Sequence, residues 1–170
     1  SDGELNQMGI TSFDQMKKEI PISKDRATNN FVHCVADAIT ANVSKSAHQG
    51  EWEVVVFDSA QVNAFALPGG KIGVYTGILN VTENQDQLAA IIGHEVGHVL
   101  ESHSNERLSA NKISDVGLAV AAMAIGATES ENKGLWLAGL GIGVQYGVIM
   151  PYSRAHESEA DIVGQDLMAR

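Results

Sequence analysis

The sequence is poor in cysteine, in aromatic residues and in basic residues. Cys34 is the only cysteine among 170 residues. This excludes an internal disulfide and a cysteine-based zinc ribbon, and we expect Cys34 to be a small buried residue on a helix. Lysine and arginine number 11 against 21 aspartates and glutamates, for a net charge of −10. Because phosphate contacts require a basic surface, the balance argues against nucleic acid as a partner.

What the sequence does contain is typical of one globular domain. Apolar residues make up 44% of the chain and charged residues 19%, within the range of compact soluble folds. The first residues show no basic-then-apolar leader, so we expect any export signal or lipid anchor to have been removed. Residues 1–22 are polar and weakly patterned up to Pro21, which predicts an N-terminal extension followed by one domain over residues 23–170.

Apolar spacing predicts the elements of that domain. Residues 24–47 have the period of one long amphipathic helix, and 51–59, "EWEVVVFDS", are rich in β-branched residues and predict a strand. Residues 61–77 predict two short strands joined by a turn at Pro68, Gly69 and Gly70. Thr82 and Gln85 have the spacing of a capping box, which would begin the next helix.

Two apolar, glycine-rich segments follow, at residues 116–128 and 134–150. The second approaches the length of a membrane span, and Gly139, Gly143 and Gly147 form a GxxxG-like stripe. Gln145 and the many glycines lower its hydrophobicity, so we favour a buried helical hairpin over a membrane span. Pro151 ends this segment, and residues 153–170 return to a helical pattern.

The stretch "AAIIGHEVGHVLESH", residues 89–103, holds the strongest chemical signal. His94 and His98 are four residues apart, so on a helix both imidazoles project from the same face and can bind one zinc ion. Glu95 is rotated by about 100° from His94. There it can flank the metal without binding it and act as a general base on a metal-activated water. Two histidines alone would hold zinc poorly, so a third ligand is required.

Four side chains are candidates for that ligand. Glu101 shares the histidine face but lies roughly 10 Å beyond His94 along the helix axis, and His103 falls on the opposite side. Glu157 and Asp161 are four apart on the last helix, so one could bind zinc while the other accepts the N–H of a ligand histidine. An acidic surface face is the alternative reading of "HESEAD". Helix geometry alone does not choose between Glu157 and Asp161.

The motifs "IIGHEVGHVLESH" and "YSRAHESEAD", with "NAFALPGGKIGVYTGIL" between residues 63 and 79, resemble one family of zinc metallopeptidases. It includes the Ste-type CaaX proteases, the HtpX membrane protease and the Oma-type proteases, and the closest resemblance is to its small periplasmic branch of LoiP-, YcaL- and BepA-like lipoproteins. The resemblance covers residues 25–170. It implies an α+β, zincin-like (gluzincin) catalytic domain over residues 23–170, mainly helical, with a small β-sheet beside the active-site helix.

The resemblance also implies roles for particular residues. It makes His94, His98 and Glu157 the ligands of one zinc ion per chain, Glu95 the general base, and Asp161 a partner behind a ligand histidine. Along the cleft, the resemblance implies substrate contacts at Asn63, Ala64, Phe65 and Ala66. Candidates to stabilise an oxyanion, because they lie close to Glu157 in sequence, are Tyr152, Arg154 and His156. An exposed strand edge at 63–66 would let an extended substrate add as another strand.

We therefore expect a zinc metalloendopeptidase that acts on unfolded or misassembled cell-envelope proteins. From the resemblance, we expect a periplasmic location with a lipid anchor in the outer membrane of a Gram-negative bacterium. Two other hypotheses remain. The chain could be a chaperone or assembly module with a structural or latent zinc site, or a membrane-inserted interaction domain built on residues 134–150. Glu95 beside the two histidines favours the enzyme, because a structural site needs no base.

Overall fold

The computed structural model describes residues 2–102 and 154–170. Its elements, in chain order, are α1 (Asp2–Glu19), α2 (Arg26–Thr40), β1 (Glu53–Phe57), β2 (Ala64–Leu67), β3 (Lys71–Tyr75), the 3₁₀ helix η1 (Thr76–Asn80), α3 (Gln85–Leu100) and α7 (Arg154–Ala169). The helices predicted at 116–128 and 134–150, with the glycine stripe, lie outside the described residues. No helix within the described residues is long and apolar enough to cross a membrane.

The three strands form one mixed sheet in the order β1-β3-β2. β1 runs parallel to β3, and β2 runs antiparallel to β3. The turn between β2 and β3 falls at Gly69 and Gly70, whose φ angles of 86° and 73° suit glycine and few other residues. The prediction of two strands joined at this turn is confirmed, as is the α+β class with a small sheet.

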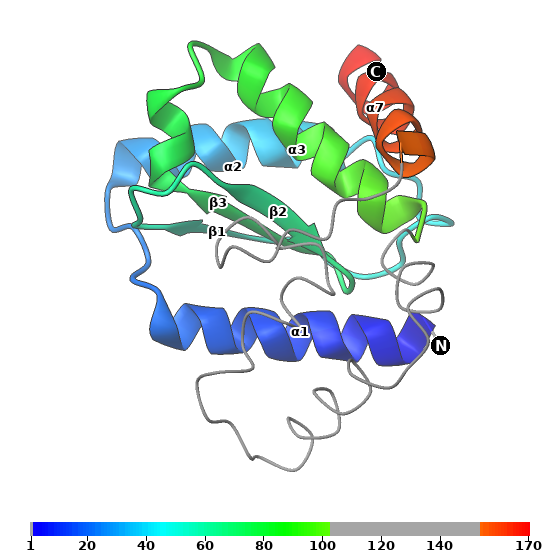
Figure 1. Cartoon of the computed structure of the whole chain (residues 1–170), viewed down its shortest axis with the longest axis horizontal. Coiled ribbons are helices and arrows are strands. Elements are labelled where there is room, and N and C mark those ends of the chain that lie inside the picture. Colours follow the sequence, from blue (N-terminus) through cyan, green and yellow to red (C-terminus); the bar gives the residue numbers. More distant parts are fainter. Residues whose placement is uncertain (1, 103–153) are drawn as a thin grey trace.

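The sheet lies between two helical layers (Figure 1). On one face, α2 and α3 cover an aliphatic core that includes Val54, Val56, Ile72 and Val74, together with Leu88, Ile92 and Val96 from α3. On the other face, α1 covers an aromatic cluster of Phe13, Phe57, Phe65 and Tyr75, in which Phe13, Phe57 and Tyr75 are fully buried. Aromatic side chains are few in this chain, and four of the nine gather in this cluster.

The helix α1 is the largest departure from the sequence interpretation. Residues 1–22 were expected to be a weakly patterned extension, but Leu5, Phe13 and Met16 repeat at helical spacing and are buried against the rest of the chain. Lysine and glutamate on the outer side, and Gly3 and Gly9, obscure that period in the sequence. The domain boundary at residue 22 stays a prediction.

Three local predictions are corrected by hydrogen bonding or exposure. The helix expected over 24–47 ends at Thr40, because the side-chain amide of Asn42 donates to the carbonyl of Ala38 and closes the last turn. The cap of α3 is Asn84 rather than Thr82. The Asn84 Oδ1 accepts from the N–H groups of Asp86 and Gln87, whereas the Thr82 hydroxyl donates back to Ile78. Cys34, expected to be buried, is exposed.

Candidate metal centre

Small residues bring α7 against α3. A Cβ atom built on Gly97 would lie 2.7 Å from the carbonyl oxygen of Ala160, and one built on Gly164 would lie 2.8 Å from the backbone nitrogen of His94. Both distances are shorter than ordinary contacts, so the helices can approach this closely only where the side chain is missing. The element packed against Gly93 and Gly97 is thus the helix that carries Glu157.

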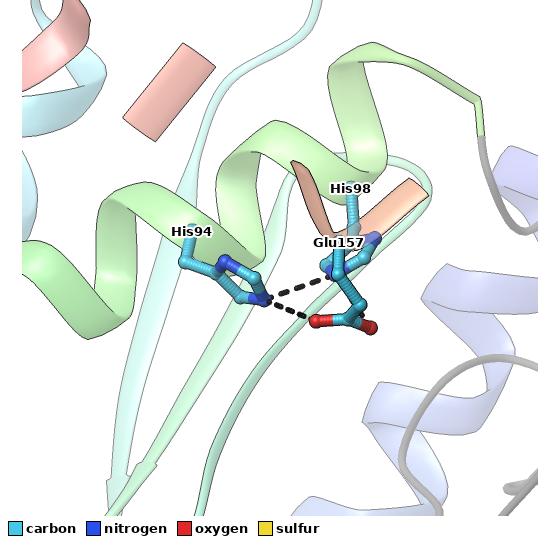
Figure 2. Close-up of side chains that lie close together, drawn as sticks. All are labelled: His94, His98 and Glu157. Carbon is cyan, nitrogen blue, oxygen red and sulfur yellow. Dashed lines mark hydrogen bonds and ion pairs between the residues drawn. The ribbon is translucent and has the colours of Figure 1, made fainter. Parts of the chain in front are cut away.

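At this crossing, His94, His98 and Glu157 point toward one another (Figure 2). The Nε2 atoms of the two histidines are 3.1 Å apart. The Glu157 carboxylate places Oε2 3.2 Å from His94 Nε2 and Oε1 3.6 Å from His98 Nε2. Among the described residues these three are the group of His, Cys, Asp and Glu side chains able to hold a metal ion.

The donor set and its spacing fit zinc. Ligand atoms placed at zinc-binding distances of about 2.0–2.1 Å in a tetrahedron lie roughly 3.3 Å apart, close to the separations found here. Two imidazoles and one carboxylate are the ligands of catalytic zinc sites that keep a fourth position open. Two ring nitrogens and a carboxylate oxygen converge here within 4.8 Å of one another, an arrangement that a bound cation stabilises. His94, His98 and Glu157 thus form the zinc site.

Asp161 lies behind the ligand His94 and selects its tautomer. His94 Nδ1 is 2.7 Å from Asp161 Oδ1; a carboxylate favours the tautomer in which Nδ1–H donates to it, and in that tautomer Nε2 is the ring nitrogen able to bind a metal. Helix geometry left open which carboxylate of α7 binds the metal. The structure places Glu157 in the ligand group and Asp161 one turn farther along α7, outside it.

Glu95 follows His94 on α3 and is not part of the ligand group. Desolvation by the surrounding protein, and to a smaller degree the charge of Glu157, raise the pKa of Glu95 to about 8. A divalent cation bound beside it would favour the carboxylate and lower this pKa. Glu95 thus neighbours His94 in the chain and is close enough to Glu157 for that charge to act on it, and its role as general base stays a prediction.

The remaining site candidates fall in different places. Glu101 caps the C-terminal end of α3 and is exposed, outside the ligand group. His156 lies on α7 next to Glu157 and is partly exposed. Arg154 begins α7, but its side chain, like the whole of Tyr152 and His103, lies outside the described residues.

The strand β2 lies beside α3 at the edge of the sheet (Figure 1). The N–H of Tyr75 donates to the carbonyl of Asn63, so in the antiparallel register the pairs Phe65–Gly73 and Leu67–Lys71 exchange hydrogen bonds. The backbone groups of Ala64 and Ala66 therefore point away from β3. Within the described residues no strand pairs with this edge, whereas the outer edge of β1 is covered at Phe57 by Ile22.

The side chains of this strand point to the two faces of the sheet. Ala64 and Ala66 are buried in the core under α2 and α3, and their small size lets α3 lie close to the strand. Phe65 packs edge-on against Phe13 of α1 on the opposite face. Asn63 precedes β2, and its side-chain nitrogen is buried with no hydrogen-bond partner among the described residues. The sequence predicted that residues 63–66 form an exposed strand edge, but not that the side chains of the strand are buried while the backbone groups of Ala64 and Ala66 point outward.

Comparisons with known proteins agree with this geometry. The model of peptidase family M48 matches residues 26–170. The chain is 32% identical over 120 residues to the mitochondrial metalloendopeptidase OMA1 of Schizosaccharomyces pombe, covering 71% of this chain and 33% of the relative. It is 26% identical over 168 residues to the β-barrel assembly-enhancing protease of Yersinia pestis, covering 96% and 34%. It is 32% identical over 115 residues to the metalloprotease YcaL of Escherichia coli, covering 68% and 43%.

These relatives include both mitochondrial and bacterial proteins, so they support the wider family named by the motifs rather than its periplasmic branch. The chain spans less than half the length of each of them. The family match covers both the HExxH helix and the helix that supplies the third ligand. The chain belongs to peptidase family M48.

Proposed function

We propose that this chain is a zinc-dependent endopeptidase that hydrolyses peptide bonds in extended, unfolded protein segments. One observation carries the proposal. Two histidines and a glutamate converge on one point at zinc-ligand spacing, while a further glutamate, Glu95, follows His94 in the chain and is affected by the charge of Glu157 without joining the ligand group. A structural zinc site needs no such carboxylate, whereas hydrolysis needs a base there.

The roles of the chain's own residues follow from their positions. His94, His98 and Glu157 would hold a zinc ion, which would supply a Lewis acid for the scissile carbonyl and for a water molecule. Glu95 accepts the proton of the attacking water and delivers it to the leaving amine. Asp161 holds the ring of His94 in the orientation and tautomer that present Nε2 to the metal.

The strand β2 supports the choice of extended segments as substrates. Ala64 and Ala66 direct their N–H and carbonyl groups to the free edge beside α3, and a polypeptide in β conformation can pair with them. Because both alanine side chains are buried, recognition at this edge would use the main chain and place little demand on substrate sequence. Folded proteins do not offer such a segment, but unfolded ones do.

The deciding experiment compares cleavage of unfolded casein by the wild type and by Glu95→Gln, both loaded with one zinc per chain. Glu83→Gln, an exposed glutamate just before α3, serves as the charge-matched control. We expect the wild type and Glu83→Gln to cleave and Glu95→Gln to lose at least about a hundredfold in rate, the contribution typical of a general base. Equal cleavage by all three would refute the role of Glu95. Zinc binding without cleavage by any of them would favour a chaperone or assembly module.

Edge pairing has its own test. Ala66→Pro removes an N–H that β3 does not use, so the sheet should survive while the substrate loses a hydrogen bond. Ala66→Gly keeps the N–H and is the matched control. We expect a higher KM for casein in the proline variant only, with zinc content unchanged. Wild-type kinetics in the proline variant would show that substrates do not pair with this edge.

The proposed setting is the bacterial cell envelope, with misassembled envelope proteins as substrates and a lipid anchor holding the mature protein at the outer membrane. Support comes from the resemblance of the motifs to periplasmic lipoproteins and from similarity to a β-barrel assembly-enhancing protease. Fractionation of cells that express the full-length protein tests the location. Recovery in the cytoplasmic fraction would refute it.

A further inference from the structure

The helix α1 lies before the part of the chain that matches the family model, which begins at residue 26. Its contacts nevertheless include β2 and the turn that follows β2. A Cβ atom built on Gly9 would overlap the carbonyl oxygen of Pro68. On the other side of the same contact, a Cβ atom built on Gly69 would lie 2.9 Å from the carbonyl oxygen of Asn6. The backbones of helix and turn therefore touch without side chains between them.

Side chains extend this contact along the strand. Phe13, fully buried, meets the ring of Phe65 edge-on with ring centroids 6.2 Å apart. Leu67, at the end of β2, is also fully buried in this cluster. On the opposite face Ala64 and Ala66 lie under α3. The edge strand is thus held between α1 and the helix that carries the metal ligands.

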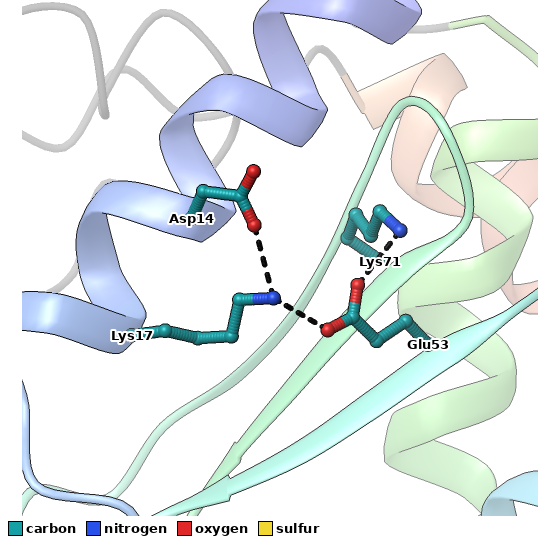
Figure 3. Close-up of polar contacts among 4 residues, drawn as sticks. All are labelled: Asp14, Lys17, Glu53 and Lys71. Carbon is teal, nitrogen blue, oxygen red and sulfur yellow. Dashed lines mark hydrogen bonds and ion pairs between the residues drawn. The ribbon is translucent and has the colours of Figure 1, made fainter.

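A charged cluster fixes α1 to the other two strands (Figure 3). The Lys17 ammonium group is 2.6 Å from Glu53 Oε1 on β1, and Lys71 at the start of β3 is 2.7 Å from Glu53 Oε2. Asp14 of α1 also contacts Lys17, at 2.9 Å. These contacts fix the rotation of α1 about its axis, and hence which of its residues face the turn after β2.

We propose that α1 is a positioning element of the substrate site. Gly9 sets the position of the edge strand β2 relative to α3, the helix that carries His94 and His98. The inference rests on the proposed function in one respect, the use of the β2 edge by substrate. Gly9 itself touches no substrate. Its missing side chain lets α1 seat on the Pro68 carbonyl at the end of β2. This contact fixes where the outward backbone groups of Ala64 and Ala66 lie relative to α3, against which β2 packs.

The test compares Gly9→Ala with Gly3→Ala in zinc-loaded protein. Both glycines lie in α1, but a Cβ atom at Gly3 meets nothing within 4 Å. In an unobstructed helix, alanine in place of glycine stabilises, so Gly3→Ala should be tolerated, whereas the Cβ of Gly9→Ala must displace α1 or the turn at Pro68. We expect Gly9→Ala to raise the KM for casein about tenfold, as when two main-chain hydrogen bonds are weakened. Zinc content and the KM for a peptide too short to reach both Ala64 and Ala66 should not change, and Gly3→Ala should match the wild type.

A binding measurement separates this inference from the proposed function. In a Glu95→Gln background, the dissociation constant of a fluorescently labelled unfolded polypeptide reports edge binding without cleavage. A weaker constant for Gly9→Ala, but not for Gly3→Ala, supports the positioning role even if the wild type proves to be no peptidase. If Gly9→Ala does not fold, Phe13→Leu, which removes the ring contact with Phe65, replaces it. Equal binding by the folded variants, or a loss of zinc that accounts for the whole effect, would overturn the inference.

Discussion

The close crossing of α3 and α7 makes Gly97→Ala a sharp test of how the zinc site is built. The new Cβ atom would lie 2.7 Å from the carbonyl oxygen and 3.0 Å from the Cα atom of Ala160. Ordinary contacts are about 3.5 Å, so the helices must separate by roughly half an ångström or more. Metal-ligand distances tolerate only about ±0.2 Å. Moving α7 carries Glu157 away from the two histidines.

The expected magnitude follows from that overlap. Overpacking of this kind costs about 1–3 kcal/mol. If α7 moves to relieve it, the cost appears as zinc binding weakened by about 5- to 150-fold. Helix propensity acts in the opposite direction, because alanine stabilises an exposed helix interior by about 1 kcal/mol over glycine. A weaker zinc site therefore cannot be attributed to a weaker helix.

The assay is competition for zinc with a chromophoric chelator, and the structure supplies a graded control. A Cβ atom at Gly93 meets its nearest neighbour, the carbonyl oxygen of Gly164, at 3.1 Å rather than 2.7 Å. Gly93→Ala should therefore weaken zinc binding less than Gly97→Ala does. A Gly97→Ala protein that is folded and binds zinc as tightly as the wild type would refute the view that the contact with Ala160 positions Glu157.

Two further predictions concern charged groups. Asp161→Asn removes the charge beside His94, and we expect zinc affinity to fall by about 10- to 100-fold. Asp166→Asn, an exposed change on the same helix, should leave zinc affinity unchanged. Equal affinities of the two variants would contradict the role of Asp161. Burial acts to raise the pKa of Glu53, but hydrogen bonds from Lys17 and Lys71 outweigh it and hold the pKa below its ordinary 4.5. Because the folded-state pKa is depressed, the stability from Glu53 is present above pH 4.5 and is lost as pH falls through the folded value. The stability difference between wild type and Glu53→Gln, measured by urea unfolding, should shrink below pH 4.5, and a difference independent of pH would contradict this.

The site was predictable because its chemistry is carried by residue types at fixed spacing. His94 and His98 share a helix face by geometry alone, and Glu157 was identified through resemblance of the flanking motif. Geometry could not separate Glu157 from Asp161, since both project from one face of α7 and either carboxylate could bind zinc. The choice depends on how far along its axis α7 crosses α3, a tertiary quantity that no local pattern contains.

The fold was predictable where the apolar period was regular and less so where polar residues interrupted it. The two strands around Gly69 and Gly70 followed from their turn. The helix α1 was missed because its buried positions include Ser12 and Gly9. The Ser12 hydroxyl donates a hydrogen bond to the carbonyl of Met8, and Gly9 lets the helix lie close to Pro68. Neither residue is a hydrophobic signal, although both lie on the buried side of the helix.

The site depends on ligand residues and on small residues that set the spacing between helices, and only the ligand residues form a recognisable sequence motif. His94, His98 and Glu157 supply ligand atoms, but Gly97 and Ala160 set the distance between the helices that carry them. On the sheet, Ala64 and Ala66 are small enough to sit under α3 while their backbone groups remain outside the β3 ladder. A side chain larger by one methyl group at Gly97 would leave the motif HExxH intact and still separate its histidines from Glu157. Retention of the motif in a variant is therefore insufficient to infer a working site, and the small residues must be inspected with it.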